Sequence, residues 1–473
     1  MKKLNFIIKC GLALLLLSFY SCESWLNVTP SDRLSEEMLF NDREGFVKAL
    51  NGVYIELNTN ELYGRNLTAG ALDVMGQYYS VASSSHAFYN YGGLVYTGND
   101  EKALFDNMWQ KCYAVIACCN TIIEKCDENK AGLSPVWRGS IKGEALALRA
   151  MLHFDMLRLF GPLTSELDKE SIPYQTNSDQ TVTPLLSGSE VVGLILDDLK
   201  NAVGLLKDTD PYFVEEEFSD TDLNYRRFRM NYFAAKGLMA RVQLWGGDKE
   251  KAAATAKEVI AEGQAEGAEF FPFVTNSEAT SSNPDRVFYS EVLFGTYHSS
   301  REKLHEDLFA PTLESTSILT LAGTARRDDL YDNENDYRYS VWSTYNKNGT
   351  SVLYHRKFEK QDNVTASRQY MIPLIRMSEM YLIAVECCKL DEASVYLNTF
   401  RNARNCNSLA LTEDNRINIL ANEYKKEMLG EGQLFFFYKR QEMVNIPDGN
   451  QATGTKNVEL AKYVVPLPES ETD

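Results

Sequence analysis

The feature that most constrains the fold of this chain is a helical hairpin, which we predict between Arg226 and Gly263. In its first half, apolar and small residues recur at helical period and form one continuous stripe. Gly246 and Gly247 end this helix, and Asp248 can cap the next one by accepting a backbone N–H. The second helix has a narrow face of alanines, which lets the two helices approach closely. One hairpin cannot bury its own apolar face, so it needs partners of the same kind.

Two further segments show related patterns. A long helix is predicted from Ser134-Pro135, which supply a cap and a first-turn proline, to the stop at Gly161-Pro162. The segment Pro373 to Ala403 repeats the hairpin pattern, with its turn at Leu390-Asp391. Three such units predict a mainly α fold in which tetratricopeptide-like helical hairpins stack into a superhelical scaffold. The alternative is an ordinary helical protein with alanine-rich contacts.

Long loops and a few short strands complete the predicted fold. The stretches from Arg286 to Tyr297 and from Thr350 to Lys360 have the aromatic and β-branched residues of strands. Between them lies the least regular part of the chain, which is rich in aromatic rings.

The N-terminus has the layout of an export signal. Met1 to Ser21 begins with lysines, continues through the apolar run Gly11 to Leu17 and is followed by Cys22. This order resembles a bacterial lipoprotein signal, which predicts a signal peptide over residues 1–21 and lipid on Cys22. The alternative is an ordinary signal peptide followed by an incidental cysteine. No later stretch is long and apolar enough to cross a bilayer, so attachment is expected through the lipid.

Charge excludes one class of partner. The chain has 48 Lys and Arg against 66 Asp and Glu, a net charge of −18 at pH 7. Because the phosphate backbone is recognised through basic residues, we expect no nucleic-acid partner.

Aromatic residues on two irregular segments are the candidate ligand-binding groups. The segment from Gly76 to Asp100 interrupts the helical pattern with Ser, Gly and Asn while carrying several tyrosines, and a second excursion runs from Tyr297 to Tyr345. A flat ring suits the face of a sugar or another planar ligand, and loops between packed helices commonly hold binding sites. The alternative is that these rings only pack the loops. The predicted ligand-binding residues are Tyr78, Tyr79, Tyr89, Tyr91, Trp342 and Tyr345.

Catalytic and metal-binding motifs are weak throughout. The chain has no Gly-x-Ser-x-Gly, no His-Glu-x-x-His and no phosphate-binding glycine loop. Asp332 to Asp336 imitates the start of a calcium loop, but Tyr337 occupies the required glycine position and Ser343 the twelfth. We therefore predict no enzyme activity, no cofactor and no metal site. A paired-carboxylate glycosidase stays open, because such a pair is defined by its separation in space.

Five segments, taken in order, resemble the SusD/RagB outer-membrane lipoproteins of Bacteroidetes-type bacteria. They are the start from Cys22 to Pro30, KGEALALRAMLHFDMLRLFGP, FRMNYFAAKGLMARVQLWGGDKEKAAATAKEVI, IPLIRMSEMYLIAVECCKLDEASVYLNTFRNAR, and the pair NEYKKEMLGEGQLFFFYKR and YVVPLPESE. The resemblance spans nearly the whole chain. One departure is Gln433 to Phe437, where the family commonly has Arg followed by Asp-Leu, and we expect this variant to pack as a helix. The shared motifs belong to the scaffold, so no ligand-binding residue transfers from them.

The resemblance implies a nutrient-binding lipoprotein on the outer face of the outer membrane. Such a protein delivers its ligand to a SusC-like TonB-dependent transporter, and a glycan is the favoured ligand. Alternatives are a peptide-binding uptake lipoprotein, a protein scaffold of the same complex that binds no ligand, and a hydrolase. Residues 22–270 are expected to form the N-terminal helical region and residues 271–473 the C-terminal region, both packed as one globular unit.

Overall fold

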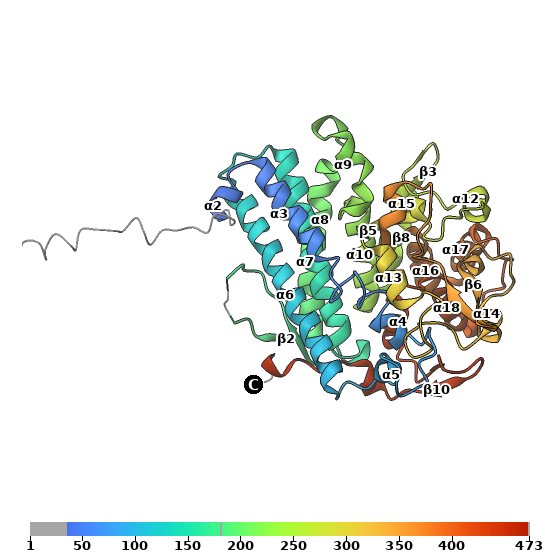
Figure 1. Ribbon diagram of the computed structural model, residues 1–473. Coiled ribbons are helices and arrows are strands. Elements are labelled where there is room, and N and C mark those ends of the chain that lie inside the picture. Colours follow the sequence, from blue (N-terminus) through green and yellow to red (C-terminus); the bar gives the residue numbers. More distant parts are fainter. Residues whose placement is uncertain (1–35, 180–181, 472–473) are drawn as a thin grey trace, which may run out of the picture.

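A computed structural model describes residues 36–179 and 182–471 (Figure 1). The predicted signal peptide and the lipidation site Cys22 lie outside the described residues. The fold is mainly α-helical, which confirms the predicted class. The helices of the first part of the chain are α2 (Glu36–Leu39), α3 (Arg43–Glu56), α4 (Ala71–Met75), α5 (Tyr89–Gly92), α6 (Asn99–Glu128), α7 (Pro135–Phe160), α8 (Gly188–Thr209), α9 (Asp220–Asn224), α10 (Tyr232–Trp245) and α11 (Lys249–Gly263).

The second part of the chain has shorter helices and most of the strands. Its helices are α12 (Asn276–Thr280), α13 (Arg301–Leu308), α14 (Thr324–Leu330), α15 (Ala366–Tyr370), α16 (Met377–Cys387), α17 (Leu390–Ala403), α18 (Glu413–Glu427) and α19 (Gln433–Arg440). The strands form two-stranded antiparallel sheets, namely β1 (Glu170–Pro173) with β2 (Leu185–Ser187), β3 (Gln264–Ala265) with β4 (Ala268–Glu269), β5 (Val292–Tyr297) with β8 (Met371–Arg376), β6 (Trp342–Lys347) with β7 (Thr350–His355), and β9 (Asn445–Pro447) with β10 (Thr455–Asn457).

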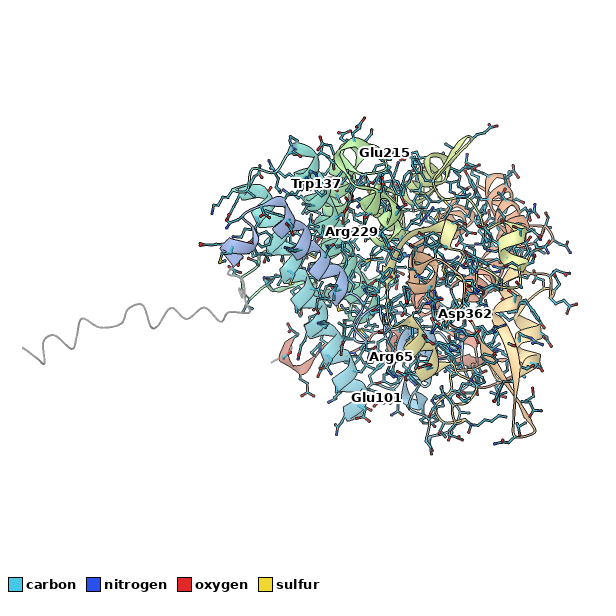
Figure 2. All side chains as sticks on the ribbon, turned by 45° about the horizontal axis from the view of Figure 1, so that its top comes forward. Arg65, Glu101, Trp137, Glu215, Arg229 and Asp362 are labelled. Atoms are coloured by element: carbon cyan, nitrogen blue, oxygen red, sulfur yellow. The ribbon has the colours of Figure 1, made fainter. Side chains whose placement is uncertain are left out.

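The long helices α6, α7 and α8 lie side by side on one flank of the molecule (Figure 1). Ser134 caps α7 by accepting a hydrogen bond from Trp137 N at 3.3 Å, and Gly161 ends the helix as predicted. Gly143 lets α8 come close, because a Cβ at this position would lie 2.8 Å from Leu206 Cγ. Small residues on α7 therefore set the spacing of this layer. Side chains fill the interior between these helices and the rest of the fold (Figure 2).

The central hairpin forms and joins the two parts of the chain, although its first helix begins at Tyr232 and not at Arg226, because Asn231 caps α10 and Arg226–Phe228 is a separate 3-10 helix. Asp248 caps α11 by accepting from Lys251 N at 3.1 Å, and Gly247 makes the turn with a φ of +84°. The hairpin packs against α16, where a Cβ at Gly263 would lie 2.7 Å from Met377 Cε. The C-terminal helices therefore dock on the hairpin instead of forming a separate core.

Two boundaries of the predicted Pro373–Ala403 hairpin are wrong. Residues from Pro373 to Arg376 belong to strand β8, whose six residues are all buried and pair with β5. A continuous apolar run of this length fits a buried strand as well as a helix, so period alone could not separate them. Leu390 and Asp391 form the first turn of α17, and the connection between the helices lies at Cys388 and Lys389 instead.

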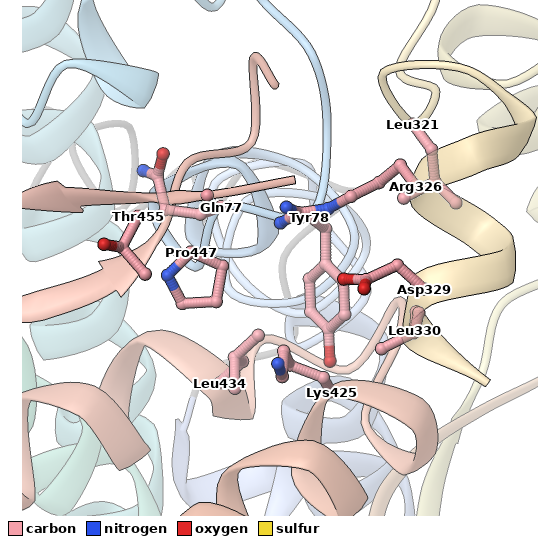
Figure 3. Close-up of a pocket in the computed structure, with 11 residues that line it drawn as sticks. Gln77, Tyr78, Leu321, Arg326, Asp329, Leu330, Lys425, Leu434, Pro447 and Thr455 are labelled. Carbon is pink, nitrogen blue, oxygen red and sulfur yellow. The ribbon is translucent and has the colours of Figure 1, made fainter. Parts of the chain in front are cut away.

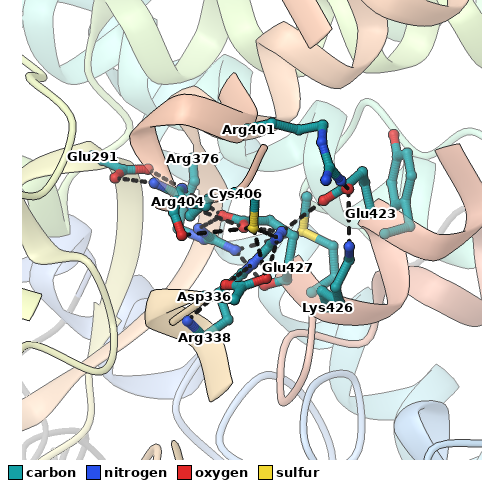
Figure 4. A network of polar contacts seen from close by, with 12 residues as sticks. Glu291, Asp336, Arg338, Arg376, Arg401, Arg404, Cys406, Glu423, Lys426 and Glu427 are labelled. Atoms are coloured by element: carbon teal, nitrogen blue, oxygen red, sulfur yellow. Dashed lines mark hydrogen bonds and ion pairs between the residues drawn. The ribbon is translucent and has the colours of Figure 1, made fainter. Parts of the chain in front are cut away.

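A buried charge network holds the C-terminal helices to their neighbours (Figure 4). Glu427 of α18 lies at its centre and accepts from Arg404 Nη2 at 2.7 Å, from Arg338 Nη1 at 3.2 Å and from Arg376. Every member of the network is less than a tenth exposed, and acidic and basic side chains alternate. We use the name charge network for Glu291, Asp336, Arg338, Arg376, Arg401, Arg404, Glu423, Lys426 and Glu427.

Within the described residues, none of the helices combines the length and the apolar character that a membrane span requires.

Candidate functional site

A groove of about 910 Å³ opens between the segment 313–324 and the hairpin of β6 and β7. Its lining mixes hydroxyl and amide groups with a few aliphatic side chains. The lining residues are Ser80, Leu313, Glu314, Ser315, Ile318, Thr320, Leu321, Gly323, Thr324, Lys347, Asn348, Thr350, Ser351, Val352 and Leu353.

One wall of the groove is shaped by a tight turn. Lys347 pairs with Thr350, so the loop between β6 and β7 has only two residues, Asn348 and Gly349, with φ angles of +53° and +87°. Two positive φ values define the turn type that fits the twist of a hairpin, and Asn-Gly is its preferred sequence. Asn346 Oδ1 also accepts from Gly349 N at 2.7 Å. The Asn-Gly pair was therefore a signal for strand β6, which our sequence reading missed.

The opposite wall is fastened to both predicted binding segments. Ser80 N donates to Thr320 O at 2.8 Å, and Thr320 Oγ1 donates to Leu353 O of β7 at 2.6 Å. Lys347 closes one end of the groove, because its ammonium donates to Leu313 O at 3.0 Å and pairs with Glu314 at 2.9 Å. The region after Gly76 and the region after Tyr297 therefore meet at this wall. None of these hydrogen-bonding residues was among the predicted ligand contacts.

The six predicted aromatic residues fall into two groups. Tyr89 and Tyr345 are each 44% exposed. The other four are buried in the core, namely Tyr78, Tyr79, Tyr91 and Trp342. These four side chains therefore belong to the interior and are not displayed on the loops. Their polar ends find partners inside the fold, as when Tyr78 OH donates to Tyr424 O at 3.2 Å and Trp342 Nε1 donates to Tyr331 OH at 3.1 Å.

Two of the buried rings meet beneath the groove at His355 of β7. The ring of Tyr79 stacks on His355 with centroids 5.9 Å apart, and the ring of Trp342 meets it edge-on at 5.5 Å. Burial lowers the pKa of His355 well below its usual range, so the imidazole is neutral. None of these three rings lines the groove, so the cluster offers no ring face to a ligand in this conformation.

Tyr345 has the opposite orientation. It pairs directly with Val352, which lines the groove, whereas Trp342 and Thr344 lie on the other face of the same strand. Residues paired across an antiparallel ladder share one face of the sheet. Tyr345 is therefore an exposed ring on the face of the hairpin that carries Val352, and it is not itself among the residues that line the groove.

Asp73 of α4 anchors the cluster to the C-terminal region. Its carboxylate accepts from Gly430 N at 2.6 Å, from Gly432 N at 2.9 Å and from Tyr79 OH at 3.2 Å. Burial raises the pKa of Asp73 to about 7, against the lowering effect of these three hydrogen bonds. Asp73 thus fixes the segment that leads into the groove, a role for which the sequence offered no motif.

Ligand chemistry follows from this lining. Hydroxyl, amide and backbone groups can exchange hydrogen bonds with a polar ligand, while Ile318, Val352 and Leu353 supply apolar contact. Sites of this composition suit small polar ligands that also have apolar faces, of which sugars are one class. No cluster of His, Cys, Asp and Glu suited to a metal ion occurs in the part of the chain that the structure describes.

Comparisons with known proteins cover both parts of the chain. Residues 24–244 match a SusD-like family model described as starch-binding and associating with the outer membrane, and residues 283–473 match the SusD family model. A SusD-like protein of Formosa agariphila is 22% identical, over 99% of this chain and 96% of the relative.

Solved structures share the fold. A SusD-like carbohydrate-binding protein of Bacteroides vulgatus aligns with a TM-score of 0.70 at 21% identity, covering 91% of this chain and 96% of that one. A laminarin-binding SusD-like protein aligns with a TM-score of 0.66 at 18% identity, covering 92% and 98%. At these identities the likeness shows a common fold.

Proposed function

The chain belongs to the SusD/RagB family, and from that premise we propose that it is a cell-surface lipoprotein that binds a glycan and delivers it to a SusC-like TonB-dependent transporter. The observation that carries the proposal is the groove of about 910 Å³, which is lined by Ser80 of the first predicted binding segment, by residues 313–324 of the second and by the β6–β7 hairpin. The family model described as starch-binding and the laminarin-binding structural neighbour both support a glycan as the ligand. We propose a binding role and no catalytic one.

Ligand binding is tested by filling the groove. Ser351 is exposed and lines the groove, so Ser351→Trp places a bulky side chain in it without disturbing the core. We expect the variant to lose most of its affinity for the glycan that the wild type binds, measured by isothermal titration against a panel that includes laminarin oligosaccharides. The matched control is Ser84→Trp, at an exposed serine that does not line the groove. Full binding by Ser351→Trp would place the site elsewhere.

A peptide is the second candidate ligand, because β7 leaves one edge toward the groove. It pairs with β6 alone among the described strands, and Leu353 O on its other edge already accepts from Thr320 Oγ1. An extended peptide can add to such an edge through main-chain hydrogen bonds. Unstructured peptides therefore belong in the same titration panel, and binding of peptides without glycans would favour this alternative.

We also propose that a lipid on Cys22 anchors the protein to the membrane. If Cys22 is lipidated, mass spectrometry of the native protein will show a mature N-terminus at Cys22 carrying acyl chains, and Cys22→Ala will release the protein from membranes. An unmodified N-terminus at another residue would contradict the anchor.

The transporter proposal is tested by mild solubilisation and capture on a C-terminal tag. We expect a TonB-dependent transporter in near-equal amount. Recovery of this protein alone in several mild detergents would count against a stable complex.

A further inference from the structure

A second hollow of about 210 Å³ adjoins the groove, and Leu321 lines both (Figure 3). It lies where α14, α18, the start of α19 and the β9–β10 hairpin come together. Its lining residues are Gln77, Tyr78, Leu321, Arg326, Asp329, Leu330, Lys425, Leu434, Pro447, Gly454 and Thr455. We call this hollow the basic pocket.

Two cations from different helices enter the basic pocket. Arg326 of α14 is 8% exposed, and within the described residues its one hydrogen bond is a long contact of 3.5 Å from Nη1 to Gln451 O. Lys425 of α18 is partly buried, and among the described residues its ammonium has neither a hydrogen bond nor an ion pair. The ring of Tyr78 lies between the two side chains (Figure 3).

The carboxylates near these two cations attract them without forming an ion pair, and they include Asp448, which acts on Arg326. Asp329 is the carboxylate in its lining, but it is exposed and forms an ion pair with neither side chain. Burial, followed by repulsion from Arg326, lowers the pKa of Lys425 to about 8, and burial lowers the pKa of Arg326. Buried charge without a partner is costly, so proteins normally place a counter-charge beside it.

The available volume and donors fit an oxyanion. A water molecule occupies about 30 Å³ in the liquid, so a hollow of about 210 Å³ has room for a carboxylate or sulfate group together with part of a sugar ring. A guanidinium offers a planar fork that matches two oxygens of such a group, and an ammonium adds a compact point charge. The hydroxyl of Tyr78 already donates to Tyr424 O, so this residue contributes its ring as a wall.

We propose that the basic pocket binds an oxyanion carried by the ligand, so that the preferred ligand is an acidic glycan with carboxylate or sulfate groups. This inference rests on the proposed function, because it assigns an acidic subsite to the ligand of the adjoining groove. Arg326 and Lys425 are the binding residues.

The experiment compares acidic and neutral forms of one glycan by isothermal titration. The pairs are a galacturonate oligosaccharide with its methyl ester, and a sulfated galactan oligosaccharide with its desulfated form. We expect the wild type to prefer the acidic member of at least one pair, and which pair shows the preference identifies carboxylate or sulfate. Arg326→Met and Lys425→Met should each weaken binding of the acidic form by about 10-fold or more and leave the neutral form unchanged.

Two further variants make the test specific. Arg327→Met is the matched control, since Arg327 is the next residue of α14, pairs with Asp328 at 2.8 Å and does not line the pocket. We expect it to bind the acidic form like the wild type. Asp329→Asn removes the competing carboxylate and should strengthen binding of the acidic form several-fold.

The outcomes separate this inference from the proposed function. If neutral and acidic forms bind equally well, or if Lys425→Met and Arg326→Met bind the acidic form like the wild type, the inference is overturned while glycan binding stands. If no glycan binds, the proposed function fails, and the pocket is then probed with sulfate and glucuronate against chloride at equal ionic strength. A rise in melting temperature that Lys425→Met abolishes supports an oxyanion site, and equal melting temperatures in all salts overturn it.

Discussion

Lys425 and Lys426 are neighbours on α18, yet their surroundings differ in one decisive respect. Lys426 belongs to the charge network, where its ammonium pairs with Glu423 at 2.9 Å and with Asp332 at 3.4 Å (Figure 4). Lys425 points into the basic pocket and has no such partner among the described residues (Figure 3). Charge that holds this fold together is matched inside the chain, whereas charge left unmatched is available to a ligand.

Mutations in the charge network and in the basic pocket are expected to have different effects. Removing one member of the network leaves its partners buried and unpaired, so the loss should appear in folding. Removing a cation from the basic pocket leaves no unpaired partner, so the loss should appear in binding.

The largest effect is expected at Glu427. Glu427→Gln removes the charge that Arg404, Arg376 and Arg338 share, and it should lower the free energy of unfolding by about 3–5 kcal/mol. Guanidinium titration followed by circular dichroism measures the change.

The matched control for Glu427 lies at the other end of the same helix. Glu413 is exposed and pairs with Arg416 at 2.7 Å, so Glu413→Gln should cost less than about 1 kcal/mol. If Glu427→Gln and Glu413→Gln lose equal free energies of unfolding, the buried charge network is no more important for stability than an ion pair at the surface.

The second effect concerns Asp73, whose partners are backbone N–H groups and a tyrosine instead of a cation. Its pKa rises from 3.8 to about 7 on folding, so the unfolded chain ionises first and the free energy of unfolding falls as pH rises between these values. Each pKa unit corresponds to about 1.4 kcal/mol, so the fall amounts to a few kcal/mol at most. Asp73→Asn should remove this pH dependence.

Stability curves at pH 5 and pH 8 test the Asp73 prediction. The free energy of unfolding of Asp73→Asn should rise relative to that of the wild type between pH 5 and pH 8. A difference between the two proteins that stays constant would mean that Asp73 is ionised in the folded state at both pH values. Asp42→Asn is the control, because Asp42 is an exposed carboxylate that caps α3 by accepting from Gly45 N at 2.9 Å.

Lys425→Met should raise stability, which is the clearest contrast with the network. A cation whose pKa falls from 10.5 to about 8 on folding destabilises the fold fully below pH 8, and this effect fades as pH rises toward 10.5. The groups that face Lys425 are Arg326 and Asp329 on α14, Tyr78, and Lys426 on its own helix.

At pH 7 we expect the Lys425→Met protein to be more stable by on the order of 1 kcal/mol, after allowance for partial solvent exposure. The gain should shrink between pH 7 and pH 9.5 in chemical unfolding curves. A loss of stability instead would mean that Lys425 has an internal partner, with Asp329 the first candidate.

The sequence predicted the helical scaffold well because helix signals are local. The cap at Ser134, the stop at Gly161 and the turn at Gly247 each act within a few residues of chain. The charge network was not predictable, since Glu291 and Glu427 are far apart in sequence and meet only through Arg404. From the sequence alone, charged residues at such positions are expected on the surface, because no local pattern shows that the fold buries them together.

The candidate site shows the same limit. The sequence indicated which two irregular segments carry the rings, but not which way each ring faces. Tyr79 and Tyr89 lie in the same loop-rich segment, yet Tyr79 is buried against His355 and Tyr89 is exposed. Orientation depends on pairing partners from β7 and from residues 430–432, which no local pattern contains.

The smallest expected effect on the free energy of unfolding is at Tyr345. This residue complements the comparison of the charge network with the basic pocket, because its side chain carries no charge. Tyr345 is 44% exposed, so Tyr345→Ala should change the free energy of unfolding by less than about 0.5 kcal/mol. If its ring stacks on the ligand in the groove, affinity should fall several-fold, since such contacts contribute about 1 kcal/mol. Tyr225→Ala is the control, because this ring is 37% exposed and belongs to the segment that follows α9, outside the β6–β7 hairpin. Isothermal titration of the glycan with both variants decides the matter. Unchanged affinity in Tyr345→Ala, beside weakened acidic-glycan binding in Lys425→Met, would assign recognition to the basic pocket alone.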